Sequence, residues 1–157
     1  METKKINLEK TKRNYPAVWE CGGATRNKGE AQIICGSNFE PLTPIYNVNW
    51  GHRCNGNHSL FVAKEGMHII SVQQYRDNVE NINILKILKI EKTTEQGGNE
   101  VYVAICSVEN IFEQGEWDKP TPDIENFKKA VECAIQKAQC YHCRESHYSL
   151  QITAKPV

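Results

Sequence analysis

Alternating apolar and polar residues dominate the first two thirds of the chain. Side chains that alternate in this way are typical of β-strands with one buried face. The pattern predicts seven strands: Ala17–Cys21, Glu30–Cys35, Ile45–Asn49, Ser59–Ala63, Met67–Gln73, Asn81–Lys92 and Val101–Val108. A short glycine-containing turn, Lys64–Gly66, separates the fourth strand from the fifth and predicts a β-hairpin. Asn81–Lys92 fits neither a strand nor a helix period cleanly, and its isoleucine content favours a strand.

Helical periodicity over a long stretch is confined to Pro122–His147. Thr121 and Pro122 suit the start of a helix, as a cap and a first-turn residue. The apolar stripe comprises Ile124, Phe127, Val131, Ala134, Ile135 and Ala138. At about 100° per residue, the opposite face carries Cys133, Lys137, Cys140 and Arg144. This face is either an ordinary solvated surface with incidental cysteines or a surface covered by a subunit or an anionic ligand.

The order of these segments predicts the fold class. Strands come first and the helix last, which favours an α+β fold with an N-terminal antiparallel β-sheet followed by a long C-terminal amphipathic helix. Residues 1–14 are interpreted as a polar lead-in, and residues 15–157 as a single α+β domain. The sheet is expected over about 15–108 and the helical part over about 109–147, with a first helical turn at Val108–Phe112. A short strand at Ser149–Thr153 closes the chain.

Composition narrows the possible partners. The 19 basic and 19 acidic residues balance, and a neutral chain is a poor candidate for binding long nucleic acid. No apolar run approaches the length of a membrane span, and residues 1–14 lack the apolar core of a secretory signal. The seven cysteines are therefore expected to be reduced thiols in a cytosol.

Two cysteine and histidine clusters suggest enzyme chemistry. Cys140, Cys143 and His147 have spacings that suit zinc, with Cys133 or Cys54 as a further ligand from elsewhere. Only one Cys-x2-Cys pair exists, however, and helix-end packing of reduced thiols explains the cluster more simply. A second cluster, His52 to His58 around Cys54, could form a thiol nucleophile with a base, although its glycine and asparagines more often indicate a turn.

Nucleotide binding is suggested by scattered arginines close to aromatic residues. Guanidinium groups bind phosphates through paired hydrogen bonds, and aromatic rings stack on bases. The loop arginines are Arg26, Arg53 and Arg76. The chain contains no GxxxxGK[ST] or GxGxxG motif, so a conventional phosphate-binding loop is not expected.

Several short segments resemble one protein family. They are Tyr15–Gly23 (YPAVWECGG), Ala31–Gly36 (AQIICG), Pro44–Tyr46 (PIY) and Asn57–Phe61 (NHSLF). In these segments the chain is similar to the first class of phage Thoeris anti-defence proteins, which are signal sponges. The resemblance extends from about Tyr15 to His147 and implies a sheet followed by C-terminal helices. It also implies a non-enzyme that binds cyclic ADP-ribose isomers, and in some members cyclic oligonucleotides, without cleaving them.

The resemblance also implies a set of ligand-binding residues. Phe112 corresponds best to the aromatic residue that stacks on adenine, and Arg144 to a phosphate-binding arginine of the C-terminal helix. Cys140 stands where a second helix arginine is expected, so Lys137 or His147 is the candidate for that contact. A neighbouring subunit could add Arg26, Arg53 or Arg76.

The leading hypothesis is therefore a phage protein that sequesters cyclic nucleotide immune signals in the host bacterial cytoplasm. It is expected to be a homo-oligomer, dimer or hexamer, without a resident metal, cofactor or catalytic residues. The alternative is a small zinc- or thiol-dependent enzyme that uses the Cys/His clusters. A structural or interaction module without a small ligand is the third possibility.

Overall fold

The computed structural model describes residues 2–11, 15–24, 27–49, 57–76, 78–113, 120–121, 125–139 and 155–156. Its main strands are β1 (Thr3–Lys10), β2 (Pro16–Ala24), β3 (Lys28–Cys35), β4 (Tyr46–Asn49), β5 (Asn57–Val62), β6 (His68–Tyr75), β7 (Asn78–Thr94) and β8 (Glu100–Glu113). The helix α1 is Glu125–Gln139, and β9 (Pro120–Thr121) pairs in parallel with β10 (Lys155–Pro156). Within these residues, no helix combines the length and hydropathy that crossing a membrane requires.

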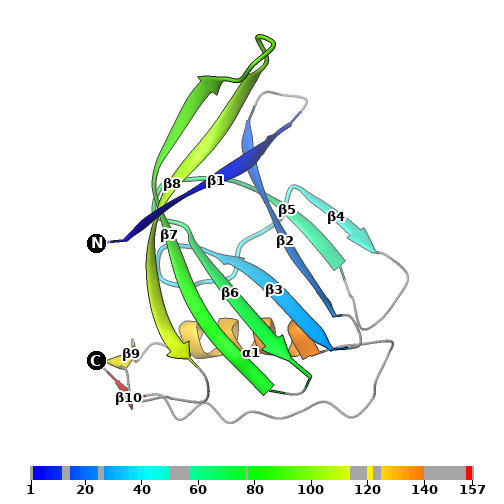
Figure 1. The fold of residues 1–157 in the computed structure, drawn as a ribbon, viewed down its shortest axis with the longest axis vertical. Helices are drawn as coiled ribbons and strands as arrows, with labels where there is room; N and C mark the ends of the chain where they lie inside the picture. The colour runs from blue at the N-terminus through cyan, green and yellow to red at the C-terminus, as the bar shows by residue number, and fades with distance from the viewer. Residues whose placement is uncertain are drawn as a thin grey trace.

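Six antiparallel strands close into a barrel (Figure 1). The order of pairing is β1–β8–β7–β6–β3–β2, and β2 returns to β1 through Glu9 opposite Ala17 and Lys10 opposite Pro16. β5 and β4 extend the sheet from β2. α1 lies across the outer side of the sheet, against β3, β6 and β2 (Figure 1).

The predicted α+β fold, a sheet followed by a long helix, is therefore wrong. The chain is mostly β, and its one helix among the described residues has 15 residues. Within the predicted lead-in, residues 3–10 form a strand of the sheet, because β1 pairs along β8 from Thr3 opposite Ser107 to Leu8 opposite Tyr102. Residues 108–112 continue β8 instead of starting a helical turn. Lysines and other polar residues at the outward positions of β1 obscure its pattern, and its partner lies about one hundred residues away in the sequence.

The seven strand segments predicted between residues 17 and 108 are confirmed, but the predicted hairpin is wrong. β5 pairs with β2 and β4, whereas β6 pairs with β3 and β7. The turn at Lys64–Gly66 sends the chain from one part of the sheet to another. Gly66 is in the left-handed region (φ 91°), and its N–H donates to the Ile87 carbonyl on β7 at 2.8 Å. Turn composition predicted the reversal of the chain correctly but not the partner strand.

Apolar side chains on the two faces of the strands form two separate hydrophobic cores, one inside the barrel and one beneath α1. Ile34, Ile69 and Leu85 point into the barrel, whereas their neighbours Ile33, Ile70 and Ile84 point outward to α1. β7 takes part in both, and its register against β8 shifts at Ile82/Asn83 and again at Ile87/Lys89. Burial on both faces of β7, together with the extra residue Leu88 at the second shift, explains why the isoleucine-rich segment fits no single period.

The apolar stripe predicted for the helix is confirmed where the structure describes it. Phe127, Val131, Ala134, Ile135 and Ala138 are all buried against the outer side of the sheet. Close approach of the helix requires glycine on β3, because a Cβ atom on Gly29 would lie 1.9 Å from the Ala138 carbonyl oxygen. Thr121 lies in β9, and its side chain, on which the predicted cap depends, is outside what the structure describes. Ile124, the predicted extension to His147 and the predicted strand at Ser149–Thr153 are also outside the described residues.

Candidate functional site

The inner face of the sheet changes from apolar to polar as it leaves the barrel. Registered residues on β3, β6 and β7 form successive rows across the sheet. The first row is Ile34, Ile69 and Leu85; the second is Gln32, Ser71 and Asn83; the third is Glu30, Gln73 and Asn81; the fourth is Lys28, Tyr75 and Asn78. The apolar row belongs to the barrel core, so the polar rows form a surface supported by a rigid sheet.

Side-chain amides on this surface form a continuous hydrogen-bonded chain. The Asn110 amide on β8 donates to Asn83 Oδ1 at 3.0 Å, and the Asn83 amide donates to Asn81 Oδ1 at 3.2 Å. Asn81 in turn donates to Gln73 Oε1 at 3.0 Å. Gln32 Nε2 donates to the Trp19 carbonyl at 2.9 Å. We call the surface formed by Gln32, Ser71, Gln73, Asn81, Asn83 and Asn110 the amide face.

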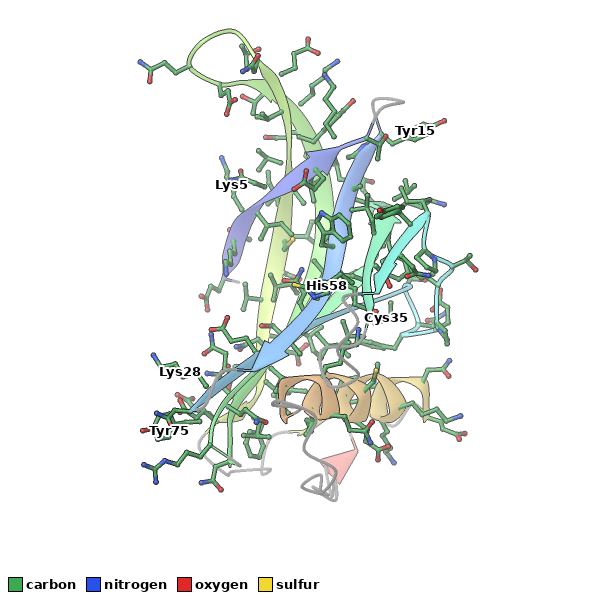
Figure 2. The ribbon with its side chains drawn as sticks, turned by 90° about the vertical axis from the view of Figure 1, so that its right-hand side faces the viewer. Lys5, Tyr15, Lys28, Cys35, His58 and Tyr75 are labelled. Atoms are coloured by element: carbon green, nitrogen blue, oxygen red, sulfur yellow. The ribbon has the colours of Figure 1, made fainter. Side chains whose placement is uncertain are left out.

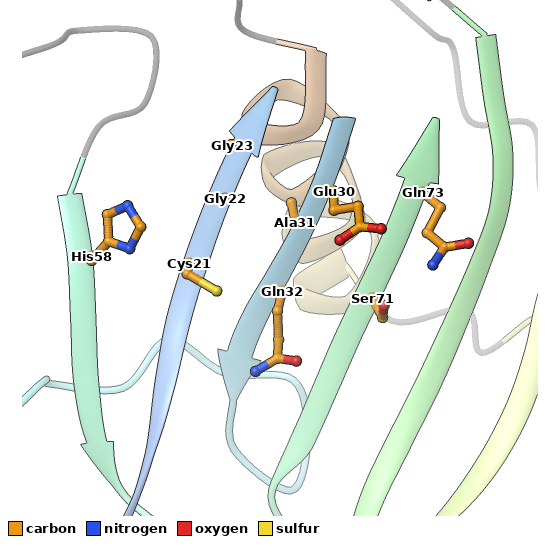
Figure 3. Close-up of a pocket in the computed structure, with 9 residues that line it drawn as sticks. All are labelled: Cys21, Gly22, Gly23, Glu30, Ala31, Gln32, His58, Ser71 and Gln73. Atoms are coloured by element: carbon orange, nitrogen blue, oxygen red, sulfur yellow. The ribbon is translucent and has the colours of Figure 1, made fainter. Parts of the chain in front are cut away.

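A cavity of about 360 Å³ lies over one side of the amide face. Figure 3 shows α1 behind the sheet, with His58 and Cys21 at one edge of the cavity. Among the lining residues, Ala31 belongs to the core beneath α1. The volume falls in the range of small-ligand sites. The lining residues are Cys21, Gly22, Gly23, Glu30, Ala31, Gln32, His58, Ser71 and Gln73.

The fourth row adds an aromatic ring and cations at the rim. Lys28 is paired with Tyr75 across the ladder, at the same end of the sheet (Figure 2). The Tyr75 side chain is 41% exposed, and the Arg76 guanidinium carbon lies 5.5 Å from the centre of its ring. This distance suits a cation–π contact.

The backbone of Arg76 holds this rim in place. Its φ of 57° is in the left-handed region, which is uncommon for residues other than glycine, asparagine and aspartate. The Arg76 N–H donates to the Asn27 carbonyl at 2.6 Å, and Gln74 Nε2 donates to the Arg76 carbonyl at 3.0 Å. The first bond attaches the β6–β7 turn to the segment that precedes β3, and the second lies within the turn itself.

The thiol beside the cavity is not prepared for nucleophilic attack. Burial raises the pKa of Cys21; the nearby Lys137 opposes this shift, and Glu20 and Glu30 add to it. A catalytic cysteine needs a lowered pKa. Within the described ranges, no cluster of three or more metal-ligating side chains occurs, and the four described cysteines, Cys21, Cys35, Cys106 and Cys133, form no disulfide.

The residues predicted to bind ligand are dispersed in the structure. Arg76 lies at the rim of the amide face. Lys137 lies on the other side of the sheet, where its ammonium pairs with the Glu20 carboxylate at 3.2 Å. Phe112 is only 3% exposed, packs in the core beneath α1 and does not line this cavity. Arg26, Arg53, Arg144 and His147, like the zinc candidates Cys54, Cys140 and Cys143, lie outside the described residues.

Sequence reasoning missed the amides themselves. Gln32, Asn81 and Asn83 occupy alternate positions in strands whose other face is strongly apolar. That signal is visible in the sequence, but it resembles an ordinary solvated strand face. Only the pairing of β3, β6, β7 and β8 brings the amides together.

No protein-family model, curated protein or solved structure matches the chain.

Proposed function

We propose that the protein is a non-catalytic sponge that binds and sequesters a small cyclic nucleotide signal on the amide face. A cyclic ADP-ribose isomer is the ligand that the resemblance to Thoeris anti-defence proteins implies. The supporting observation is the graded series of rows, in which hydrogen-bonding amides lie beside an exposed aromatic ring and two cations.

Each part of such a ligand has a matching group on this surface. Asparagine and glutamine amides donate and accept at once, which suits the edge of adenine. Tyr75 offers a ring on which a base can stack. Arg76 and Lys28 provide positive charge for phosphates, and Arg76 can form paired hydrogen bonds to two oxygens.

The carboxylate of Glu30 orients the ligand. It repels phosphates and accepts hydrogen bonds from ribose hydroxyls or an exocyclic amine. Successive rows are two residues apart along a strand, or roughly 7 Å. The phosphates are therefore directed to the Lys28–Tyr75 row, with the sugar and base over the amides.

The side chains that line the cavity favour binding without cleavage. Cys21 and His58 are its nucleophile and base candidates, and burial keeps the Cys21 pKa raised. An enzyme that uses the thiol would need the opposite shift. The phage origin, the cytoplasmic site of action and assembly into a homo-oligomer belong to the same proposal and rest on the resemblance.

The decisive experiment separates binding from turnover. Purified protein is incubated with a cyclic ADP-ribose isomer, the unbound ligand is removed, and the protein is denatured by heat. Recovery of intact ligand in a fixed ratio to protein supports the sponge. Recovery of a linear or hydrolysed product indicates an enzyme instead, and the absence of retained ligand refutes the proposal for that ligand.

A further inference from the structure

A second cavity lies on the opposite side of the sheet, between α1 and the strands β2, β3 and β5. Its volume is about 490 Å³. Its walls include Phe39, Leu42, Phe61 and Ala130, so most of its surface is apolar. It shares no lining residue with the cavity on the amide face. A concave, largely apolar space with a few polar groups is the usual form of a small-molecule site.

The wall formed by Phe39 has an unusual backbone. Phe39 has a φ of 60° and is 6% exposed. Its ring stacks on His68 at a centroid distance of 4.1 Å and meets Phe127 edge-on at 5.1 Å. A buried aromatic residue in the left-handed region is retained only where its surroundings fix it, and such residues concentrate at functional sites.

The polar groups of this cavity carry more positive than negative charge. Lys129 and Lys137 of α1 and Glu20 of β2 are its charged lining residues. Both oxygens of the Glu20 carboxylate already accept hydrogen bonds, from the Ile34 N–H at 3.1 Å and from the Lys137 ammonium at 3.2 Å. Among the residues that the structure describes, Lys129 pairs only with Glu125, in a solvent-exposed i,i+4 contact at 3.4 Å, which a ligand anion can replace at little cost.

We propose that this cavity binds a small aliphatic carboxylate, with its hydrocarbon chain against Phe39, Leu42 and Phe61 and its carboxylate at Lys129. Charge complementarity selects the anion: a cationic head would meet two ammonium groups and a carboxylate already satisfied by the protein. The apolar walls of the cavity favour the hydrocarbon chain of the ligand. This site is independent of the nucleotide site proposed above.

Octanoate is the probe, measured by calorimetric titration against the full-length protein. Hexanoate should bind about fifteenfold more weakly, since each buried methylene contributes about 0.8 kcal/mol, or about fourfold. Octanol and octylammonium, which keep the chain and change the head group, should bind at least about fivefold more weakly than octanoate. Failure of octanoate to bind at millimolar concentration, or octylammonium binding as tightly, overturns the proposal.

Variants locate the binding. Lys129→Gln should weaken octanoate binding about threefold to tenfold, and Lys89→Gln, which alters an exposed lysine of β7, should leave it unchanged. Cys133→Phe places a ring at the cavity edge from an exposed helix position and should abolish octanoate binding. Unchanged binding in folded Cys133→Phe, checked by circular dichroism, also overturns the proposal; if that variant does not fold, the Lys129→Gln result decides. Because neither Lys129 nor Cys133 lines the amide-face cavity, Lys129→Gln and Cys133→Phe should retain any cyclic nucleotide binding.

Discussion

The ammonium of Lys137 on α1 and the carboxylate of Glu20 on β2 meet at 3.2 Å, with 21% and 16% of their side chains exposed. The pair lies where β2 and β3 separate: their ladder ends at Cys21 opposite Gln32. Beyond that point Glu20 Oε1 replaces the missing ladder partner by accepting the Ile34 N–H. One carboxylate therefore holds the diverging strands together and attaches the helix to the barrel. The predicted cationic helix face is thus covered at Lys137 by the protein's own sheet.

Loss of one member of this pair should destabilise the fold. Lys137→Met leaves Glu20 largely buried without its cation, and we expect a cost of about 1–3 kcal/mol in the free energy of unfolding, measured in urea. The double variant Glu20→Gln/Lys137→Met should cost less than the sum of the single changes. Additive effects would show that the two groups do not stabilise one another.

Gly29 should tolerate no side chain. A Cβ atom there would lie 1.9 Å from the Ala138 carbonyl oxygen, so Gly29→Ala must push α1 away from β3. The expected loss is about 3 kcal/mol of unfolding free energy. Gly23→Ala is the matched control, because it lies on the neighbouring strand with no atom within 4 Å of the added Cβ. Equal stability of the two variants would contradict the close helix packing.

His68 should make stability depend on pH. Burial lowers the pKa of His68 below its ordinary 6.5, opposed by its hydrogen bond to the Gly36 carbonyl; Lys86 lowers it further, and Glu40 and Glu109 raise it. Between the lowered pKa and 6.5, His68 is therefore protonated in the unfolded chain and neutral in the folded chain. This contribution to stability is complete above pH 6.5 and is lost as the pH falls toward the lowered value.

Urea unfolding between pH 7.5 and pH 5 measures this effect. Staying above pH 5 keeps Glu40, whose pKa its backbone hydrogen bonds lower from 4.5, ionised. His68→Gln should be less stable at neutral pH but show a flatter dependence in this range. A parent protein with constant stability from pH 7.5 to pH 5 would contradict the neutral, buried imidazole.

Local pattern predicted the strands β2 to β8 and the buried stripe of α1, because alternation and the helical period depend on neighbouring residues. It did not predict barrel closure. β1 has only Ile6 and Leu8 as inward apolar signals, and its pairing with residues 102–107 of β8 is long-range. The same limit led to the wrong hairpin between β5 and β6.

The arrangement of the candidate site was harder to predict from sequence than the fold, because it depends on the same long-range strand pairing. Arg76 was identified from its residue type, and its neighbour Tyr75 lies with it at the rim. Phe112 was assigned through the resemblance, but it is buried in the core beneath α1, since β8 continues as a strand to Glu113. Asn83 and Asn110 are 27 residues apart in the sequence and become hydrogen-bonded only through the register of β7 and β8.

Substitutions on the amide face should weaken ligand binding without unfolding the protein. Asn81→Leu interrupts the hydrogen-bonded chain between Asn83 and Gln73 and removes a donor and an acceptor from the surface. We expect the affinity for a cyclic ADP-ribose isomer to fall by about 1–3 kcal/mol, measured by calorimetry. Phe112→Leu is the contrasting variant: it should lower stability and leave the affinity of the folded protein unchanged. If Phe112→Leu weakened the affinity and Asn81→Leu did not, the result would place the binding site at Phe112.

Arg76 and Tyr75 provide the sharpest test of the proposed site. Arg76→Asn removes the guanidinium but keeps a residue that tolerates the left-handed backbone at φ 57°. Loss of a charge-assisted hydrogen bond to phosphate should cost about 1.5–3 kcal/mol, a tenfold to hundredfold weakening. Arg76→Lys should restore only part of it, because lysine cannot bind two oxygens in parallel.

Tyr75→Leu should cost about 1–3 kcal/mol through lost stacking, since leucine keeps the apolar bulk but has no ring. Lys92→Gln, at the far end of β7 in an exposed pair with Glu100, should bind like the parent. Raised salt should weaken the parent more than Arg76→Asn, because the variant has lost a phosphate contact that ions screen. If Arg76→Asn, Tyr75→Leu and Asn81→Leu all bind the cyclic nucleotide like the parent, the amide face is not the site, and a sponge activity would have to reside elsewhere on the chain.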